Sequence, residues 1–126
     1  MLAETNKGCC SGGPNLIFAC SGAADVGAIA DLAARKMTRE GNGSMFCLAG
    51  ISGRIDPIMK KTETADRILA IDGCPLNCVK ATLEAAGFTK LDHLQLADLG
   101  LEKGSSPAND ENVSKVAVAG AALLAS

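Results

Sequence analysis

The sequence predicts one α/β domain, a three-layer sandwich in which helices flank a mainly parallel sheet of about four strands. The chain has 126 residues, of which 48% are hydrophobic, so it can bury one core and is short for two domains. Short apolar runs alternate with segments of helical periodicity along most of its length. Such βα units build parallel sheets.

The first strand and the first helix follow one another closely. Residues 16–19 (Leu-Ile-Phe-Ala) are a continuous apolar run, as expected of a strand buried on both faces. Apolar residues then recur at spacings of three and four over residues 26–37, which predicts a helix. Asp25 is suited to the start of this helix, and Gly41 is suited to its termination.

Two further apolar runs predict the second and third strands. Residues 45–49 (Met-Phe-Cys-Leu-Ala) form the first of them, and we expect a turn over residues 50–53 and a helix over about 57–65 to follow. Residues 68–71 (Ile-Leu-Ala-Ile) predict the third strand, which the Asp72-Gly73 pair ends.

The last third of the chain predicts two helices around one short strand. Pro75 suits the first turn of a helix over residues 76–86. Residues 93–96 (His-Leu-Gln-Leu) predict a fourth strand. A polar loop precedes the final helix, which Asn109 or Asp110 could cap.

Four cysteines are predicted to gather at one edge of this sheet. Parallel strands all end at the same edge and lie about 4.8 Å apart, so residues at their ends converge. Cys20 follows the first strand, Cys47 lies near the end of the second, and Cys74 follows the third. Cys78 comes four residues after Cys74, and one helical turn would place it on the same side.

Four thiolates in one place fit a tetrahedral zinc ion. The same sulfur shell suits iron or an iron–sulfur cluster, so these alternatives stay open. Amide groups at the starts of the helices after Cys20 and Cys74 would offset the negative charge, and Gly22, Gly50 and Gly73 would let the backbone approach the sulfurs. The competing interpretation is that free cysteines are often buried, and that the three apolar strands contain one each by chance.

Several nearby residues have both a functional and a structural interpretation. Asp72 could cap or orient the turn that carries Cys74, or could be an ordinary turn residue. We expect His93, the single histidine, to be a surface or strand-end residue and not a ligand. Residues 1–14 are Gly-rich and without periodicity, so we interpret them as a flexible tail. The tail contains Cys9-Cys10, which could alternatively be a metal-delivery or redox pair.

Established enzyme motifs do not fit these cysteines. A cysteine phosphatase needs an arginine after five intervening residues, and the corresponding positions hold Val26, Gly53 and Lys80. The sequence has no CxxC pair, GxxxxGK loop or GxGxxG fingerprint, and one histidine cannot supply a triad. Enzymatic activity is therefore left open, with no catalytic residue assigned. A metal-binding protein is favoured, and a redox or sulfur-transfer protein with one reactive thiol is the alternative.

Three sequence segments resemble the DGC domain family. They are Ala-Cys-Ser-Gly-Ala at 19–23, Cys-Leu-Ala-Gly-Ile at 47–51 and Ile-Asp-Gly-Cys-Pro-Leu-Asn-Cys at 71–78, within a similarity that spans about residues 16–103. The family is described as zinc-binding on the basis of its cysteines.

The resemblance implies a DGC-type metal-binding domain over residues 15–126. The ligands that it implies are Cys20, Cys47, Cys74 and Cys78. It implies no reaction, so the biochemical role beyond metal binding is left open.

Composition narrows the set of partners. The 12 basic and 14 acidic residues give a net charge of -2 without a basic cluster, and aromatic residues make up only 2%, so we expect no nucleic-acid binding. The first residues lack a secretory pattern, and the apolar segment 113–125 is shorter than the roughly 20 residues that span a bilayer. We therefore expect a cytoplasmic protein whose partner is a metal ion, with a protein partner or a second copy left open.

Overall fold

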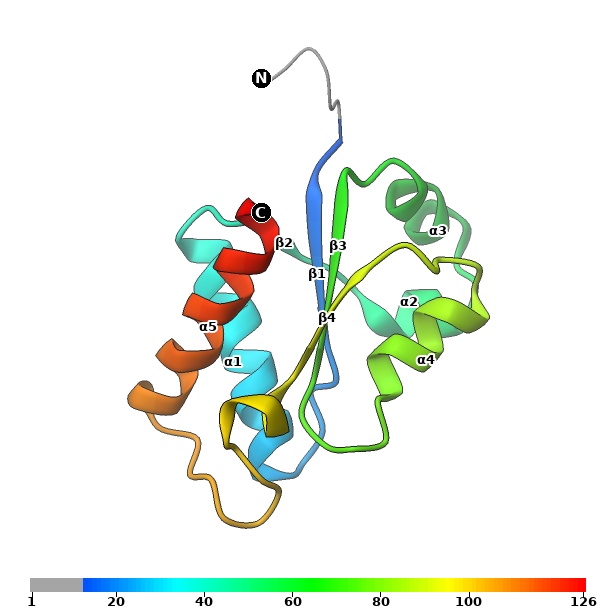
Figure 1. The fold of residues 1–126 in the computed structure, drawn as a ribbon. Helices are drawn as coiled ribbons and strands as arrows, with labels where there is room; N and C mark the ends of the chain where they lie inside the picture. Colours follow the sequence, from blue (N-terminus) through cyan, green and yellow to red (C-terminus); the bar gives the residue numbers. More distant parts are fainter. Residues whose placement is uncertain (1–12) are drawn as a thin grey trace.

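The computed structural model describes residues 13–126, so most of the expected tail, including Cys9 and Cys10, lies outside the described residues (Figure 1). In chain order the elements are β1 (Asn15–Ala19), α1 (Asp25–Arg39), β2 (Ser44–Met45), α2 (Leu48–Ser52), α3 (Asp56–Glu63), β3 (Arg67–Asp72), α4 (Cys78–Ala85), β4 (Asp92–Gln95), a short 3-10 helix η1 (Leu96–Leu99) and α5 (Asp110–Ala125).

The four strands form one parallel sheet in the order β2-β1-β3-β4. β1 and β3 pair along their whole common length, from Asn15 opposite Arg67 to Ala19 opposite Ile71. These two strands occupy the centre of the sheet and are buried on both faces. Their position explains why residues 16–19 and 68–71 are uniformly apolar.

Helices cover both faces of the sheet, which confirms the predicted three-layer α/β domain (Figure 1). α1 and α5 pack on one face, where they meet Ile17, Leu69 and Ile71. α2, α3 and α4 lie on the other face, against Leu16 and Phe18. The strand residues divide between the two faces because successive side chains of a strand point to opposite sides.

Small residues let α5 approach α1 closely. Ala30, Ala33 and Ala34 on α1 are fully buried in the core that α5 completes. A Cβ added to Gly120 of α5 would lie 2.8 Å from the sulfur of Met37. The Ala- and Gly-rich last helix therefore packs on its own domain. No helix within residues 13–126 combines the length and the apolar character needed to cross a membrane.

The predicted second strand over residues 45–49 is wrong in extent. β2 covers Ser44–Met45, the N–H of Phe46 still donates to the carbonyl of Ile17 (2.8 Å), and a helix begins at Leu48. The thiol of Cys47 accepts the N–H of Gly50 at 3.4 Å and so caps this helix. A short apolar run has no periodicity that separates a strand from a helical turn, which explains the error.

The helix predicted over residues 76–86 begins later, at Cys78. Asn77 adopts a left-handed conformation (φ 56°), which interrupts helical geometry and leaves Pro75 in the preceding loop. The fourth strand begins one residue earlier than predicted, at Asp92. The predicted cap of the last helix is confirmed, because Asn109 accepts the N–H of Asn112 at 2.9 Å.

Candidate metal centre at the carboxyl edge of the sheet

The strand order creates a switch point at the carboxyl edge between β1 and β3. From β1 the chain crosses through α1 to β2 on one side, whereas β3 and β4 lie on the other side. In open α/β sheets, ligands bind in the crevice outside the strand ends at such a switch point. The segments that carry Cys20 and Cys74 leave β1 and β3 at this place, and Cys47 follows β2.

Cys20 joins the two central strand ends. Its N–H donates to the carbonyl of Ile71 (3.3 Å), and its sulfur accepts the N–H of Gly73 (3.4 Å). Cys74 follows Gly73 directly, and both cysteines are partly buried against the same core cluster. The structure therefore brings the Cys20 and Cys74 loops together, as the strand-end positions predicted.

Glycines hold these two loops against the first turn of α1. A Cβ added to Gly73 would lie 2.6 Å from the carbonyl oxygen of Val26, and one added to Gly27 would lie 2.7 Å from backbone N and O of Gly22. These separations are too short for any side chain at Gly73 or Gly27. Close approach of the Gly73 backbone to a sulfur was expected, and the N–H of Gly73 does lie 3.4 Å from the sulfur of Cys20. The close approach of Gly73 to Val26 was not predicted.

The other two cysteines are exposed at the starts of helices on the opposite face. Cys47 caps α2, and Cys78 is the first residue of α4. The two helices contact one another, and Ile51 of α2 and Val79 of α4 share one core cluster. Cys47 therefore lies on a helix cap and not, as expected, at the end of a long strand.

The Cys20 and Cys74 loops meet, but the four cysteine side chains do not form a preassembled shell. Within residues 13–126, no three side chains of Cys, His, Asp or Glu are arranged so that they could hold a metal ion. Metal coordination by Cys20, Cys47, Cys74 and Cys78 stays a prediction.

Backbone strain is found beside two of these cysteines. In the described part of the chain, the non-glycine residues with positive φ are Ser21 (55°), Arg54 (55°) and Asn77 (56°). Ser21 follows Cys20, and Asn77 precedes Cys78. Such conformations cost about 1–3 kcal/mol each and gather at functional sites. Two of the three residues with positive φ therefore adjoin candidate ligands.

Asp72 caps the helix that begins with Cys78. Its carboxylate is 1% exposed and accepts the N–H groups of Val79 (2.8 Å) and Lys80 (3.1 Å). Nε2 of His93 lies 2.9 Å from the same carboxylate, where an Nε2–H donates to it. A buried carboxylate needs such donors. Asp72 is therefore more than an ordinary turn residue, but its contacts hold the start of α4 and not the turn that carries Cys74.

Gln95, which was not predicted to be a site residue, contacts the loop between Cys74 and Cys78. Its side-chain N–H₂ donates to the carbonyl of Cys74 (2.9 Å) and to Oδ1 of Asn77 (2.7 Å). His93 and Gln95 are two residues apart on β4, so they share one face of the strand. The sequence feature that could have indicated Gln95 is the pair of polar residues, His93 and Gln95, at alternate positions of the predicted fourth strand.

A family comparison bears on this arrangement of four cysteines. The family model described as the DGC domain matches residues 16–119, which is most of the chain and includes all four. The chain belongs to the DGC domain family. The resemblance noted from the three cysteine segments is thereby confirmed.

One curated relative of this DGC domain is the anaerobic and virulence modulator AnvM of Pseudomonas aeruginosa. The two chains are 36% identical over 88 residues, which cover 70% of this chain and 67% of AnvM. No solved structure matches the chain significantly.

A second loop of the DGC domain is fastened next to the Cys20 loop by Asp25. The carboxylate of Asp25 accepts N–H groups from Gly104 (2.9 Å), Ser106 (3.0 Å) and Val26 (2.8 Å). These backbone donors, first Gly104 and then Ser106, lower the pKa of Asp25 below its usual value of 3.8. The loop around Gly104 is thus tied to the start of α1.

We expect the hydrogen bonds between Asp25 and the Gly104 loop to weaken in acid. The folded pKa of Asp25 is below the unfolded one, so its stabilisation is complete above about pH 4 and is lost as the pH falls through the folded pKa. Hydrogen-exchange protection of the Gly104 and Ser106 amides should therefore be constant above about pH 4 and should decrease as the pH falls further, through the folded pKa of Asp25. In Asp25→Asn this extra decrease should be absent. If the protection of these amides had the same pH dependence in wild type and in Asp25→Asn, the carboxylate of Asp25 would not be what holds the Gly104 loop.

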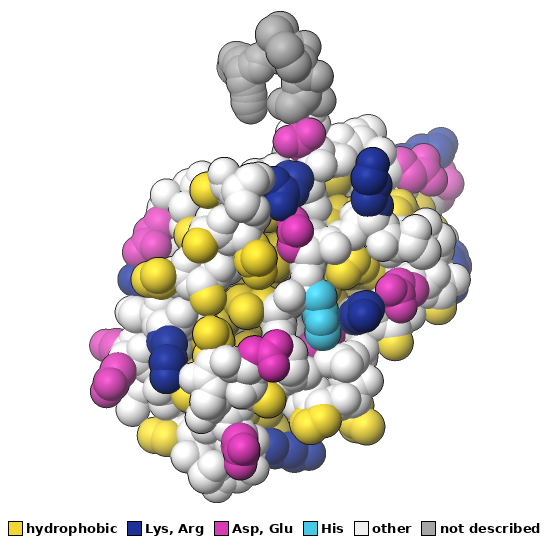
Figure 2. Space-filling view, in the orientation of Figure 1, with side chains coloured by type: hydrophobic (Ala, Val, Ile, Leu, Met, Phe, Trp, Pro, Cys, Tyr) yellow, Lys and Arg dark blue, Asp and Glu magenta, His cyan; other side chains and the backbone are white. Residues whose placement is uncertain are grey.

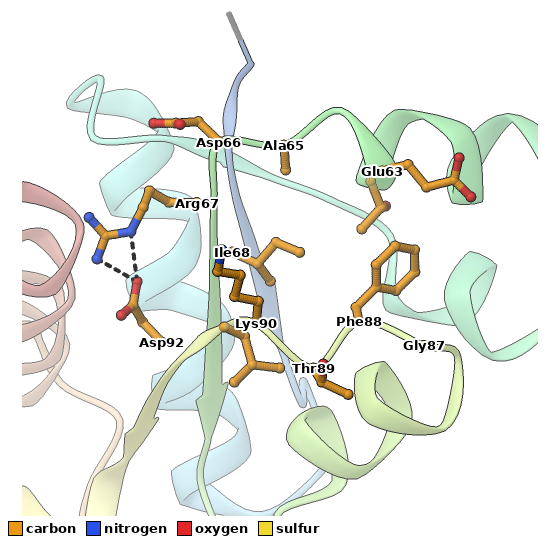
Figure 3. Close-up of a pocket in the computed structure, with 12 residues that line it drawn as sticks. Glu63, Ala65, Asp66, Arg67, Ile68, Gly87, Phe88, Thr89, Lys90 and Asp92 are labelled. Carbon is orange, nitrogen blue, oxygen red and sulfur yellow. Dashed lines mark hydrogen bonds and ion pairs between the residues drawn. The ribbon is translucent and has the colours of Figure 1, made fainter. Parts of the chain in front are cut away.

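A hollow of about 430 Å³ lies at the opposite, amino edge of the sheet (Figure 3). Its lining comes from two segments, residues 62–68 and 87–92, neither of which contains a cysteine. Arg67 donates to Asp92 (2.7 and 3.1 Å) and to the carbonyls of Leu123 and Ser126 (both 2.9 Å). The guanidinium therefore links β3, β4 and the end of α5, and we assign it a structural role.

Proposed function

We propose that this DGC domain is a metal-binding module that holds one zinc ion through the thiolates of its four cysteines. The proposed ligands are Cys20, Cys47, Cys74 and Cys78. The observation that carries the proposal is the contact between the sulfur of Cys20 and the N–H of Gly73, which joins two cysteine loops at the switch point of the sheet.

The donor set fits zinc in its chemistry. Four soft thiolates satisfy the tetrahedral preference of this ion. Backbone N–H groups of Gly50 and Gly73 donate to the sulfurs of Cys47 and Cys20, and such donors stabilise negative charge on sulfur. The side chains must still turn toward one another. Cys47 and Cys78 are exposed, so their side chains have space to do so.

Zinc would act here as a cross-link between loops. It would supply a closed shell without an open coordination position, which is the pattern of structural and not of catalytic sites. A metal that joins the segments after β1, β2 and β3 would couple loop order to metal supply. The name of AnvM describes a modulator, which accords with a binding module that acts on a partner. A reducing compartment such as the cytoplasm would keep the thiols available.

Metal analysis of the protein, purified without added zinc and without oxygen, tests this proposal. We expect about one zinc per chain, and four thiols that become reactive only after chelation. Replacing any of the four cysteines by serine should weaken zinc binding by more than the roughly 10–100-fold that loss of an outer hydrogen-bond partner costs. No bound metal together with a single hyper-reactive thiol would refute the module.

The double variant Cys9→Ser, Cys10→Ser is the matched control. It removes two thiols from outside the proposed shell and should keep the wild-type zinc content. Iron and sulfide in place of zinc in the oxygen-free preparation would identify an iron–sulfur protein.

A redox or sulfur-transfer protein is the second candidate. The exposure of the Cys47 and Cys78 thiols favours it, because a reactive thiol must be accessible. This candidate predicts one cysteine that reacts much faster than the others in metal-free protein, and no change in that rate after chelation.

A further inference from the structure

The polar side chains on one face of β4 contact Asp72 and the loop between Cys74 and Cys78. His93 and Gln95 point to the α4 side of the sheet, whereas Asp92 and Leu94 point to the α5 side, where they meet Arg67 and the core. Of this polar pair, Gln95 contacts the loop itself, and His93 contacts Asp72 at the end of β3. In Figure 2 the histidine side chain lies at the molecular surface, beside side chains of both charges.

The loop has little apolar packing of its own to fix it. Pro75 is exposed, and Leu76 at its tip is 76% exposed. Asn77 holds a positive φ, a conformation that the surroundings must maintain. The order of the loop therefore depends on its hydrogen bonds.

These hydrogen bonds fix both ends of the loop. Gln95 binds the carbonyl of Cys74 at one end and the side chain of Asn77 at the other. His93 acts through Asp72, whose carboxylate holds the first turn of α4 by two backbone N–H groups. Nε2 of His93 is engaged in this contact.

We propose that His93 and Gln95 are positioning residues that hold Cys74 and Cys78 ready to bind the metal. This inference rests on the proposed metal-binding function. Outer-shell partners of metal ligands orient them, and losing one costs about 10–100-fold in metal affinity. Neither side chain is proposed as a ligand.

The test uses the full chain and cobalt(II) alone, with affinity measured by competition against a chelator of known strength. Gln95→Leu and His93→Leu should each weaken cobalt binding by about 10–100-fold and alter the absorption bands of the cobalt–thiolate complex. His93→Gln keeps an N–H donor for Asp72 and should recover most of the affinity.

Asp92→Asn is the matched control. It lies on the same strand and weakens the Arg67 contact at the opposite end of the sheet, so it should lower stability and leave cobalt affinity unchanged. Cobalt affinity within about twofold of wild type in both leucine variants would overturn the positioning role and leave the metal site standing. Wild-type protein that binds no cobalt would refute the proposed function, and the inference with it.

Discussion

Replacing Gly73 by alanine is expected to destabilise the domain by about 3 kcal/mol or more. The added methyl group would lie 2.6 Å from the carbonyl oxygen and 2.7 Å from the carbonyl carbon of Val26. These are backbone atoms in the first turn of α1, so they cannot rotate away as a side chain would. The Cys74 loop would have to separate from α1. Urea unfolding monitored by circular dichroism measures the loss.

Gly22→Ala is the control for this prediction. It makes the same chemical change in the Cys20 loop, where a new Cβ would meet no atom within 4 Å. We expect its stability to stay within about 0.5 kcal/mol of wild type. Equal urea midpoints for Gly73→Ala and wild type would show that the loop is not pressed against α1.

Asp72→Asn is expected to cost about 2–4 kcal/mol of stability, the second large effect. The carboxylate is buried and accepts N–H groups from Val79, Lys80 and His93. An amide offers one acceptor atom and places a donor against donors, so buried N–H groups lose their partner. Urea unfolding gives the free energy, and hydrogen exchange at the Val79 and Lys80 amides locates the change.

Asp98→Asn is the charge-matched control, since Asp98 is exposed on η1 and loses the same charge. Its free energy of unfolding should stay close to that of wild type. If the Val79 and Lys80 amides exchanged no faster in Asp72→Asn than in wild type, Asp72 would not be the cap of α4. If it were stable but bound zinc weakly, the carboxylate would serve the metal site and not the fold.

The local pattern of the sequence determined much of this protein. The uniformly apolar runs over residues 16–19 and 68–71 follow from strands covered on both faces, and they indicated a parallel sheet. Asn109 was recognisable as a cap because capping depends on residues a few positions apart. Cys20 and Cys74 could be placed at strand ends for the same reason.

The position of Cys47 could not be obtained in this way. Whether a short apolar segment continues a strand or turns into a helix depends on what it packs against, and Gly50 of α2 packs directly on Ile58 of α3. The left-handed Asn77 likewise delays α4, and a contact with Gln95, 18 residues away, accompanies it.

By itself, then, the sequence determined the fold class, the two central strands and the candidate ligands, because these depend on periodicity and on short-range spacing. Only the tertiary structure decided that β1 lies between β2 and β3, and that Asp72 meets His93 across 21 positions. Such contacts depend on strand order and on the side to which each residue points. Both are fixed when the sheet and its helices pack together.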